Sequence, residues 1–118
     1  MPREYQAELI SAKVMPVAHP FGGGIEIKDG ETTPFIVERN WAAPAGHYIE
    51  EWSIRDGAKV LHRSGSRSIF IRGLQSSTVH RDEVAEPLAL PVGDFQLVLV
   101  VEGRFMGSVE VTSAPAGA

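Results

Sequence analysis

The residues of this chain that could support chemistry are four histidines and a pair of adjacent glutamates. The histidines lie far apart in the sequence: His19, His47, His62 and His80. No two of them have the spacing that lets side chains of one strand or helix share a metal ion. A metal site would require His62 and His80 to converge across strands, completed by Asp82 or Glu83. The spacing does not require this, so we predict exposed or locally hydrogen-bonded histidines, with no metal and no other cofactor.

Glu50 and Glu51 precede Trp52 in a segment that we expect to form a strand. Because successive side chains of a strand point to opposite faces, the two carboxylates cannot work together as an acid and a base. If Trp52 points inward, Glu50 does too, and it then needs a cationic partner such as Arg39 or Arg72. We prefer a buried structural ion pair here over a catalytic carboxylic acid.

Two loops rich in small residues have the composition of anion-binding loops. Phe21-Gly22-Gly23-Gly24 lacks the following helix that a phosphate-binding loop needs, because Ile25–Ile27 reads as a strand. Ser64–Ser68 has the composition of a linker between strands. No Ser-His-Asp order with a nucleophile elbow is present. We therefore predict that the chain is not an enzyme.

Length, charge and cysteine usage limit the class of protein. The chain has 118 residues, no cysteine and a formal net charge of −4. This length accommodates one domain, which we place at residues 1–112, followed by a flexible tail at 113–118. The lack of cysteine excludes disulfides and fits a cytoplasmic location. The negative charge argues against a nucleic-acid partner, and the lack of a long apolar run argues against a membrane.

Apolar residues recur at every second position far more clearly than at helical spacing. Turn signals such as Asp29-Gly30 and Asp56-Gly57 separate the apolar stretches, which gives about seven to eight short strands at roughly ten-residue spacing. The fold class predicted from this pattern is all-β, an antiparallel sandwich of two sheets.

Trp52, in a strand that ends at Asp56-Gly57, and the corner Leu90–Leu97 before a terminal hairpin have a familiar layout. It resembles immunoglobulin-like and fibronectin type III-like β-sandwich domains. That family usually has Tyr at the corner where this chain has Phe95, and no Cys pair brackets Trp52. The resemblance implies an architecture and no specific activity.

The terminal hairpin poses a register problem. An unbroken two-residue turn at Glu102-Gly103 would place Glu110 on the same face as Leu97, and burying that carboxylate without a partner would cost several kcal/mol. We therefore predict a longer loop or a bulge, with Gly103 at positive φ. One apolar face would then align two rows: Phe95, Leu97, Leu99 and Val101 with Phe105, Gly107, Val109 and Val111.

Val98 and Val100 form a second apolar row on the opposite face of the penultimate strand. A solvated face would carry polar residues there, so this row is either covered locally or meets a protein partner. The second alternative gives our preferred function, a non-catalytic module for protein interaction, assembly or self-association.

Loop aromatics suggest a different function, the binding of a small ligand or carbohydrate. Trp41 and Tyr48 flank the loop 42–47 and would provide a stacking platform if exposed. Trp41, however, follows Phe35 and Val37 on one strand face, which favours a core position. An enzyme of unknown type is the third alternative. The candidate interface or ligand-binding residues are Phe21, Trp41, His47, Tyr48, Val98 and Val100.

Overall fold

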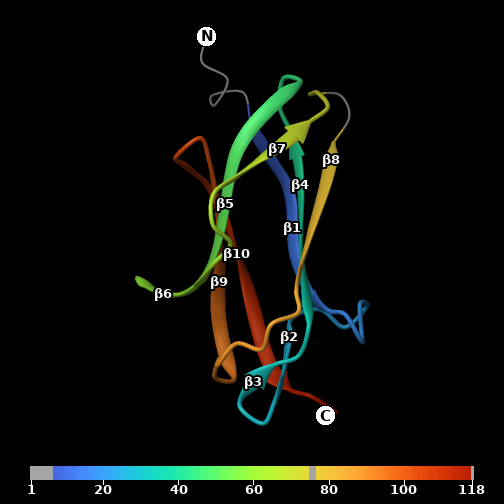
Figure 1. Ribbon diagram of the computed structural model, residues 1–118, viewed down its shortest axis with the longest axis vertical. Coiled ribbons are helices and arrows are strands. Elements are labelled where there is room, and N and C mark those ends of the chain that lie inside the picture. The colour runs from blue at the N-terminus through green and yellow to red at the C-terminus, as the bar shows by residue number, and fades with distance from the viewer. Residues whose placement is uncertain (1–6, 75–76, 118) are drawn as a thin grey trace.

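A computed structural model describes residues 7–74 and 77–117 of the chain. Within these ranges the molecule consists of strands, turns and loops without a helix, so no helix that could cross a membrane is found there. Ten strands form two layers (Figure 1). The smaller sheet contains β1 (Glu8–Pro16), β4 (Phe35–Ala42) and β8 (Thr78–Val84). The larger sheet contains β2 (Ile25–Lys28), β3 (Glu31–Thr32), β5 (Gly46–Asp56), β6 (Lys59–Arg63), β7 (Arg67–Ile71), β9 (Gly93–Val101) and β10 (Arg104–Pro115).

The smaller sheet has the order β1-β4-β8, and the larger sheet has the order β3-β2-β10-β9-β5-β6. β7 also pairs with β5, at the half of that strand that β6 leaves free. The long central strand β5 curves along the larger sheet, which curls partway around the smaller one (Figure 1). The prediction of an all-β protein with two sheets is confirmed.

The prediction of a purely antiparallel sandwich is wrong. β2 runs parallel to the end of β10, with Ser113, Ala114 and Pro115 opposite Ile25, Glu26 and Ile27. The strand count is also higher than predicted, and the two-residue strand β3, which the pattern did not predict, pairs with β2 through a hairpin at Asp29-Gly30. Mixed pairing and a curled larger sheet depart from a plain immunoglobulin-like sandwich.

The segment predicted to be a flexible tail begins inside β10. Ser113 is buried, and its hydroxyl donates to the carbonyl oxygen of Pro91 at 2.7 Å while it accepts from the amide of Gly93 at 2.9 Å. The amide of Ala116 donates to the carbonyl of Ile27. The strand therefore continues into the predicted tail because β2 gives it a partner, which local composition does not reveal.

The core follows the predicted period-two pattern. Alternate residues of β4, β5 and β9 are buried between the layers, as the strand pleat requires. The largest buried apolar side chains are Trp41, Trp52, Tyr48, Phe35, Ile54, Ile71, Leu97 and Leu99. These residues form one continuous cluster, which holds the two sheets face to face.

The terminal hairpin contains the predicted bulge. Val101 pairs with Arg104 through a two-residue turn, and the register then shifts between Phe105 and Gly107. Below the shift Gly107 lies opposite Leu99, as predicted, and Gly103 has a φ of 77°. Only Phe105 departs from the predicted inward row, because it precedes the bulge and lies opposite Val100.

Candidate functional site

The outward face of the larger sheet carries a row of apolar side chains that cross four strands. We call this set the outer patch: Ile49 of β5, Phe70 of β7, Val98 and Val100 of β9, and Phe105 of β10. Ile49 is 46% exposed, Phe70 47% and Phe105 66%, whereas the two valines are half-buried. Large apolar side chains exposed together on one face are typical of protein contact surfaces.

Strand register brings these residues together. Phe105 lies directly opposite Val100, and Val100 lies opposite Glu51 on its other side. Ile49 precedes Glu51 by two residues on the same face of β5, so it is a diagonal neighbour of Val100. Phe70 lies opposite His47, which is two residues before Ile49. The patch is thus continuous from β7 across β5 and β9 to β10.

His47 forms one end of this surface. Its ring meets the ring of Phe70 edge to face, with the ring centroids 5.2 Å apart. Such a contact orients both rings without burying them. The predicted site residues His47, Val98 and Val100 are therefore on one face, as candidates for a single surface.

A polar rim borders the patch beside Val100. Glu51 accepts hydrogen bonds from Arg63 and from the Ser66 hydroxyl, each at 3.4 Å. Ser108 lies opposite Val98, toward the other edge of the sheet. An apolar centre with a polar rim is the usual composition of a protein interface.

The other predicted site residues lie elsewhere. Trp41 and Tyr48 have no exposed surface, and the Tyr48 hydroxyl donates to the carbonyl of Pro44 at 2.5 Å. Neither ring can provide a stacking platform in this arrangement, which is the outcome that the strand pattern favoured for Trp41. Phe21 is fully exposed on the loop between β1 and β2, outside the patch.

Sequence analysis missed Ile49, Phe70 and Phe105 as members of the patch. The signal for Ile49 was present, because inward Tyr48 and Glu50 place the residue between them outward. The same alternation applies to Phe70 between buried Ile69 and Ile71. Phe105 was assigned to the wrong face because the bulge follows it.

The interior contains a buried polar network between the sheets. Glu50 binds Arg39 through two hydrogen bonds, of 2.5 and 3.0 Å, and accepts a third from the Trp41 indole at 2.6 Å. This confirms that Glu50 points inward and pairs with Arg39 instead of Arg72. Asp82 lies 3.2 Å from the Arg39 guanidinium, so the two carboxylates share its charge. The network joins the two layers, because Arg39 and Trp41 of the smaller sheet both bind Glu50 of the larger one.

A small cleft of about 230 Å³ opens beside this network. Trp52 donates its indole N–H to Asp82 at 2.7 Å, and Arg67 also binds that carboxylate. Burial lowers the pKa of His62, partly offset by the nearby Glu86. Burial, followed by the proximity of Arg39, also lowers the pKa of Arg67. Within 7–74 and 77–117, no three His, Asp or Glu side chains are grouped to hold a metal ion.

Comparisons with known proteins show a likeness of fold alone. No protein-family model matches the chain, and no curated protein matches its sequence. A solved structure of Pseudomonas fluorescens alkylpurine DNA glycosylase AlkC, bound to DNA containing an abasic site analogue, aligns with a TM-score of 0.59 and 11% identity. β-Glucosidase from Listeria innocua in complex with isofagomine aligns with a TM-score of 0.53 and 11% identity.

These alignments cover nearly all of this chain and a minor part of each similar protein. They span 92% of this chain against 30% of the DNA glycosylase, and 91% against 16% of the β-glucosidase. Identities this low carry no activity across. None of these matches supports the immunoglobulin-like or fibronectin type III-like assignment, which stays a prediction.

Proposed function

We propose that this protein is a non-catalytic interaction module that binds a partner protein through the outer patch. The observation that carries the proposal is the joining of half-buried Val98 and Val100 to three exposed apolar side chains on one sheet face. Covering this surface removes apolar area from water at about 25 cal/mol per Å². The cross-strand contacts hold the side chains in place before binding, which reduces the entropy lost on association.

The comparisons support this proposal in one respect. In both solved structures the similar fold is a small part of a much longer chain, so a sheet pair of this kind occurs beside other protein surfaces. We propose the same context here, an accessory or assembly role in which the sheet pair is a rigid scaffold. The DNA and sugar-analogue ligands of those structures are properties of those proteins.

The two alternative functions have less support. A carbohydrate or small-ligand module depended on Trp41 and Tyr48, and both rings are buried. An enzyme would need reactive groups that converge in a cleft. Of the carboxylates that line the small cleft, Asp82 is already bound to Trp52 and Arg67, and no bond joins Glu83 or Glu86 to the cleft histidine His62 among those formed by the described residues.

Site-specific photo-crosslinking in the native host tests the proposal. A photoreactive phenylalanine analogue replaces Phe105 in one variant and Phe70 in another, and Val92 in the control variant. Val92 is 55% exposed and lies in the loop before β9, outside the patch. We expect both patch variants to crosslink to the same protein and the Val92 variant not to do so. Equal crosslinking from all three positions, or none from the patch, contradicts the proposal.

The identity of the crosslinked protein determines the type of assembly. A crosslink to a second copy, together with a mass that rises with concentration in light scattering, indicates self-association. A crosslink to another chain indicates a hetero-complex. Ile49→Lys should then weaken that association at least tenfold, whereas Val92→Lys should leave it within about twofold, because only the first places a charge in the apolar contact.

A further inference from the structure

The last strand of the larger sheet has a second edge that is mostly uncovered. β10 pairs with β9 along almost its entire length. On its other side, among the residues that the structure describes, it pairs only through Ser113, Ala114 and Pro115, with the short strand β2. The stretch from Gly107 to Val111 therefore has a free edge, and Gly24 and β2 cover the edge from Thr112 onward.

The direction of the free backbone groups follows from the pleat. A β-carbon on Gly24 would lie 2.5 Å from the carbonyl oxygen of Thr112, so that oxygen points away from β9 and is covered by the chain that leads into β2. Residues two apart in a strand direct their N–H and C=O groups to the same side. The backbone groups of Ser108 and Glu110 consequently point to the same side, where the edge is free. Ala116 follows Thr112 by four residues and so has the same orientation, and its amide donates to the carbonyl oxygen of Ile27 on that side.

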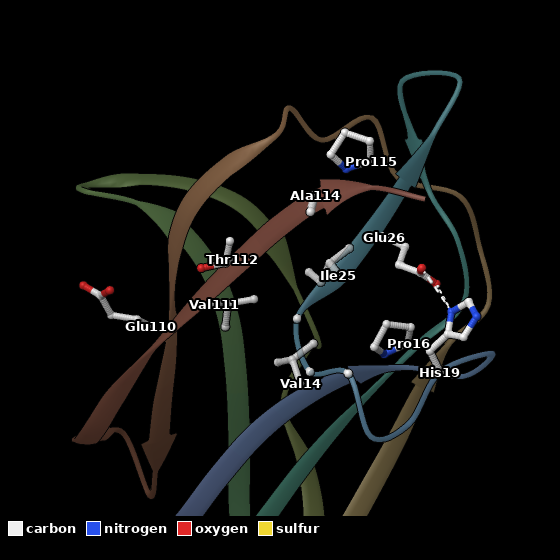
Figure 2. A pocket seen from close by; sticks show the side chains of 13 residues that line it. Val14, Pro16, His19, Ile25, Glu26, Glu110, Val111, Thr112, Ala114 and Pro115 are labelled. Carbon is white, nitrogen blue, oxygen red and sulfur yellow. Dashed lines mark hydrogen bonds and ion pairs between the residues drawn. The ribbon is translucent and has the colours of Figure 1, made fainter. Parts of the chain in front are cut away.

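A groove of about 520 Å³ lies where the chain before β2 diverges from β10 (Figure 2). Its apolar floor includes Val14, Ile25 and Val111, which are all buried. Figure 2 shows Val111 and Val14 near the middle of the groove, with Glu110 pointing away at one end. At the other end His19 pairs with Glu26, with 3.0 Å between Nδ1 and Oε1. The groove thus joins an unpaired backbone edge to apolar surface.

The carboxylates at the two ends of the groove, Glu26 and Glu110, differ in whether they have a charged partner. Glu26 already has His19 as its partner. Glu110 is exposed and takes part in none of the ion pairs formed among residues 7–74 and 77–117. Glu110 lies on the outward face and Val111 on the inward face of β10. A strand added here would place a cation opposite Glu110 and small apolar side chains on either side of it, facing the floor.

We infer that the free edge of β10 binds an extended segment of a partner protein by strand addition, with a Lys or Arg opposite Glu110 and small apolar residues flanking that cation. Main-chain hydrogen bonds to Ser108 and Glu110 supply affinity, and the groove and the carboxylate supply selectivity. This surface is separate from the outer patch and does not depend on it.

The carboxylate argues against a second copy of this chain as the occupant. Two β10 strands paired about an axis at Glu110 would place two carboxylates opposite each other, and like charges directly opposite destabilise a strand pair. The bulge at Phe105–Gly107 further interrupts the edge that two copies would share. A short cationic strand avoids both obstacles.

The test is a nuclear magnetic resonance titration of the isotope-labelled full chain with the capped heptapeptide Ser-Thr-Val-Lys-Val-Thr-Ser. We expect the largest amide shifts at Ser108 and Glu110, because their N–H groups gain acceptors. Hydrogen exchange at these two amides should slow roughly tenfold at saturation. The matched control is the same peptide with N-methyl groups on Lys and both Thr, which keeps every side chain and removes the donors that face β10.

Two protein variants separate the charge effect from the backbone effect. Glu110→Gln should weaken the heptapeptide about threefold, the range of an exposed ion pair. Glu31→Gln removes an exposed carboxylate from β3 and should leave the affinity unchanged. Equal binding of the N-methylated peptide, shifts concentrated on the outer patch, or no shifts at millimolar peptide would each overturn strand addition at β10. None of these results bears on the crosslinks expected from Phe70 and Phe105.

Discussion

Arg39 and Glu50 link the two sheets through a bidentate ion pair. Arg39 belongs to β4 of the smaller sheet and Glu50 to β5 of the larger sheet, and their side chains are 1% and 0% exposed. The guanidinium Nε and Nη2 lie 3.0 and 2.5 Å from the two carboxylate oxygens. Buried charges of this kind are tolerated because each satisfies the other, so the loss of one leaves the other unpaired.

Glu50→Gln should destabilise the protein by about 3–5 kcal/mol, because it leaves the Arg39 guanidinium buried without its main counter-charge. Urea unfolding followed by tryptophan fluorescence measures this change. Glu51→Gln is the matched control. The Glu51 carboxylate is adjacent in sequence, points outward and makes only long contacts of 3.4 Å. The control should lose less than about 1 kcal/mol. Equal losses in the two variants would mean that the buried pair contributes no more to stability than the exposed carboxylate of Glu51.

His80 should make stability depend on pH. Burial is the main cause that lowers the pKa of His80, while Glu50 opposes the shift and Arg39 adds to it. The unfolded chain, with a histidine pKa of about 6.5, therefore takes up the proton first as pH falls. The free energy of unfolding should be constant above that value and decrease below it, toward the lower folded pKa. Urea midpoints between pH 8 and pH 5 measure the slope.

His80→Gln provides the control for this slope. The neutral imidazole donates from Nε2 to the carbonyl of Phe70 at 3.1 Å, and a glutamine amide can donate in the same way without a charge. The variant should retain stability at pH 8 and lose less of it by pH 5. The remaining slope would include His62, whose pKa burial also lowers. An unchanged slope would remove His80 as its cause.

Gly24→Ala should destabilise the protein more than Gly23→Ala. Both glycines have positive φ, 79° and 72°, so both alanines are strained by about 1 kcal/mol. Only at Gly24 would the new β-carbon meet a backbone atom, the Thr112 oxygen at 2.5 Å, whereas Gly23 faces open space. Thermal unfolding should show at least about 1 kcal/mol of additional loss. Equal melting temperatures would show that the loop does not press against β10.

Removal of residues 113–118 should destabilise the sheet, whereas removal of residues 117–118 should not. The longer truncation removes the pairing of β10 with β2 and the hydrogen bonds of the buried Ser113 hydroxyl to Pro91 and Gly93. The shorter one keeps the bond from Ala116 to Ile27. We expect a loss of about 2–4 kcal/mol for the longer truncation, from several unmade hydrogen bonds at roughly 1 kcal/mol each. In the full chain, where β10 pairs with β2, the backbone amides of β2 should exchange with solvent more slowly than those of β3.

Period-two patterning was sufficient to predict the layers and part of the interior. An inward Trp52 implied an inward Glu50, and the need for a counter-charge pointed to Arg39 or Arg72, of which Arg39 is the partner in the structure. A longer loop or a bulge in the last hairpin was predictable for the same reason, because an unbroken register from a two-residue turn would bring Glu110 onto the core face, and the structure has the bulge. Local alternation determines these features, so one sequence contains enough information to find them.

Pairing between distant segments was not predictable in the same way. The parallel contact of β2 with β10 joins a short predicted strand to a segment whose own composition signals a tail, and nothing local pairs the two. The Trp52 bond to Asp82 depends on which strands of the two sheets face each other, and strand order does not follow from periodicity. The outer patch was predictable only in part. Alternation along each strand predicts which side chains point outward, but it does not predict which strands lie beside one another.

The contact between β2 and the end of β10 also determines when this fold can close during synthesis. The emerging chain makes β2 early, yet β10, which flanks it opposite β3, leaves the ribosome after the other nine described strands. Until then Ile25 and Ile27, which are buried in the finished protein, have no sheet to join on that side. We expect nascent chains that stop before Ser113 to be protease-sensitive at residues 17–30, with protection gained in a single late step.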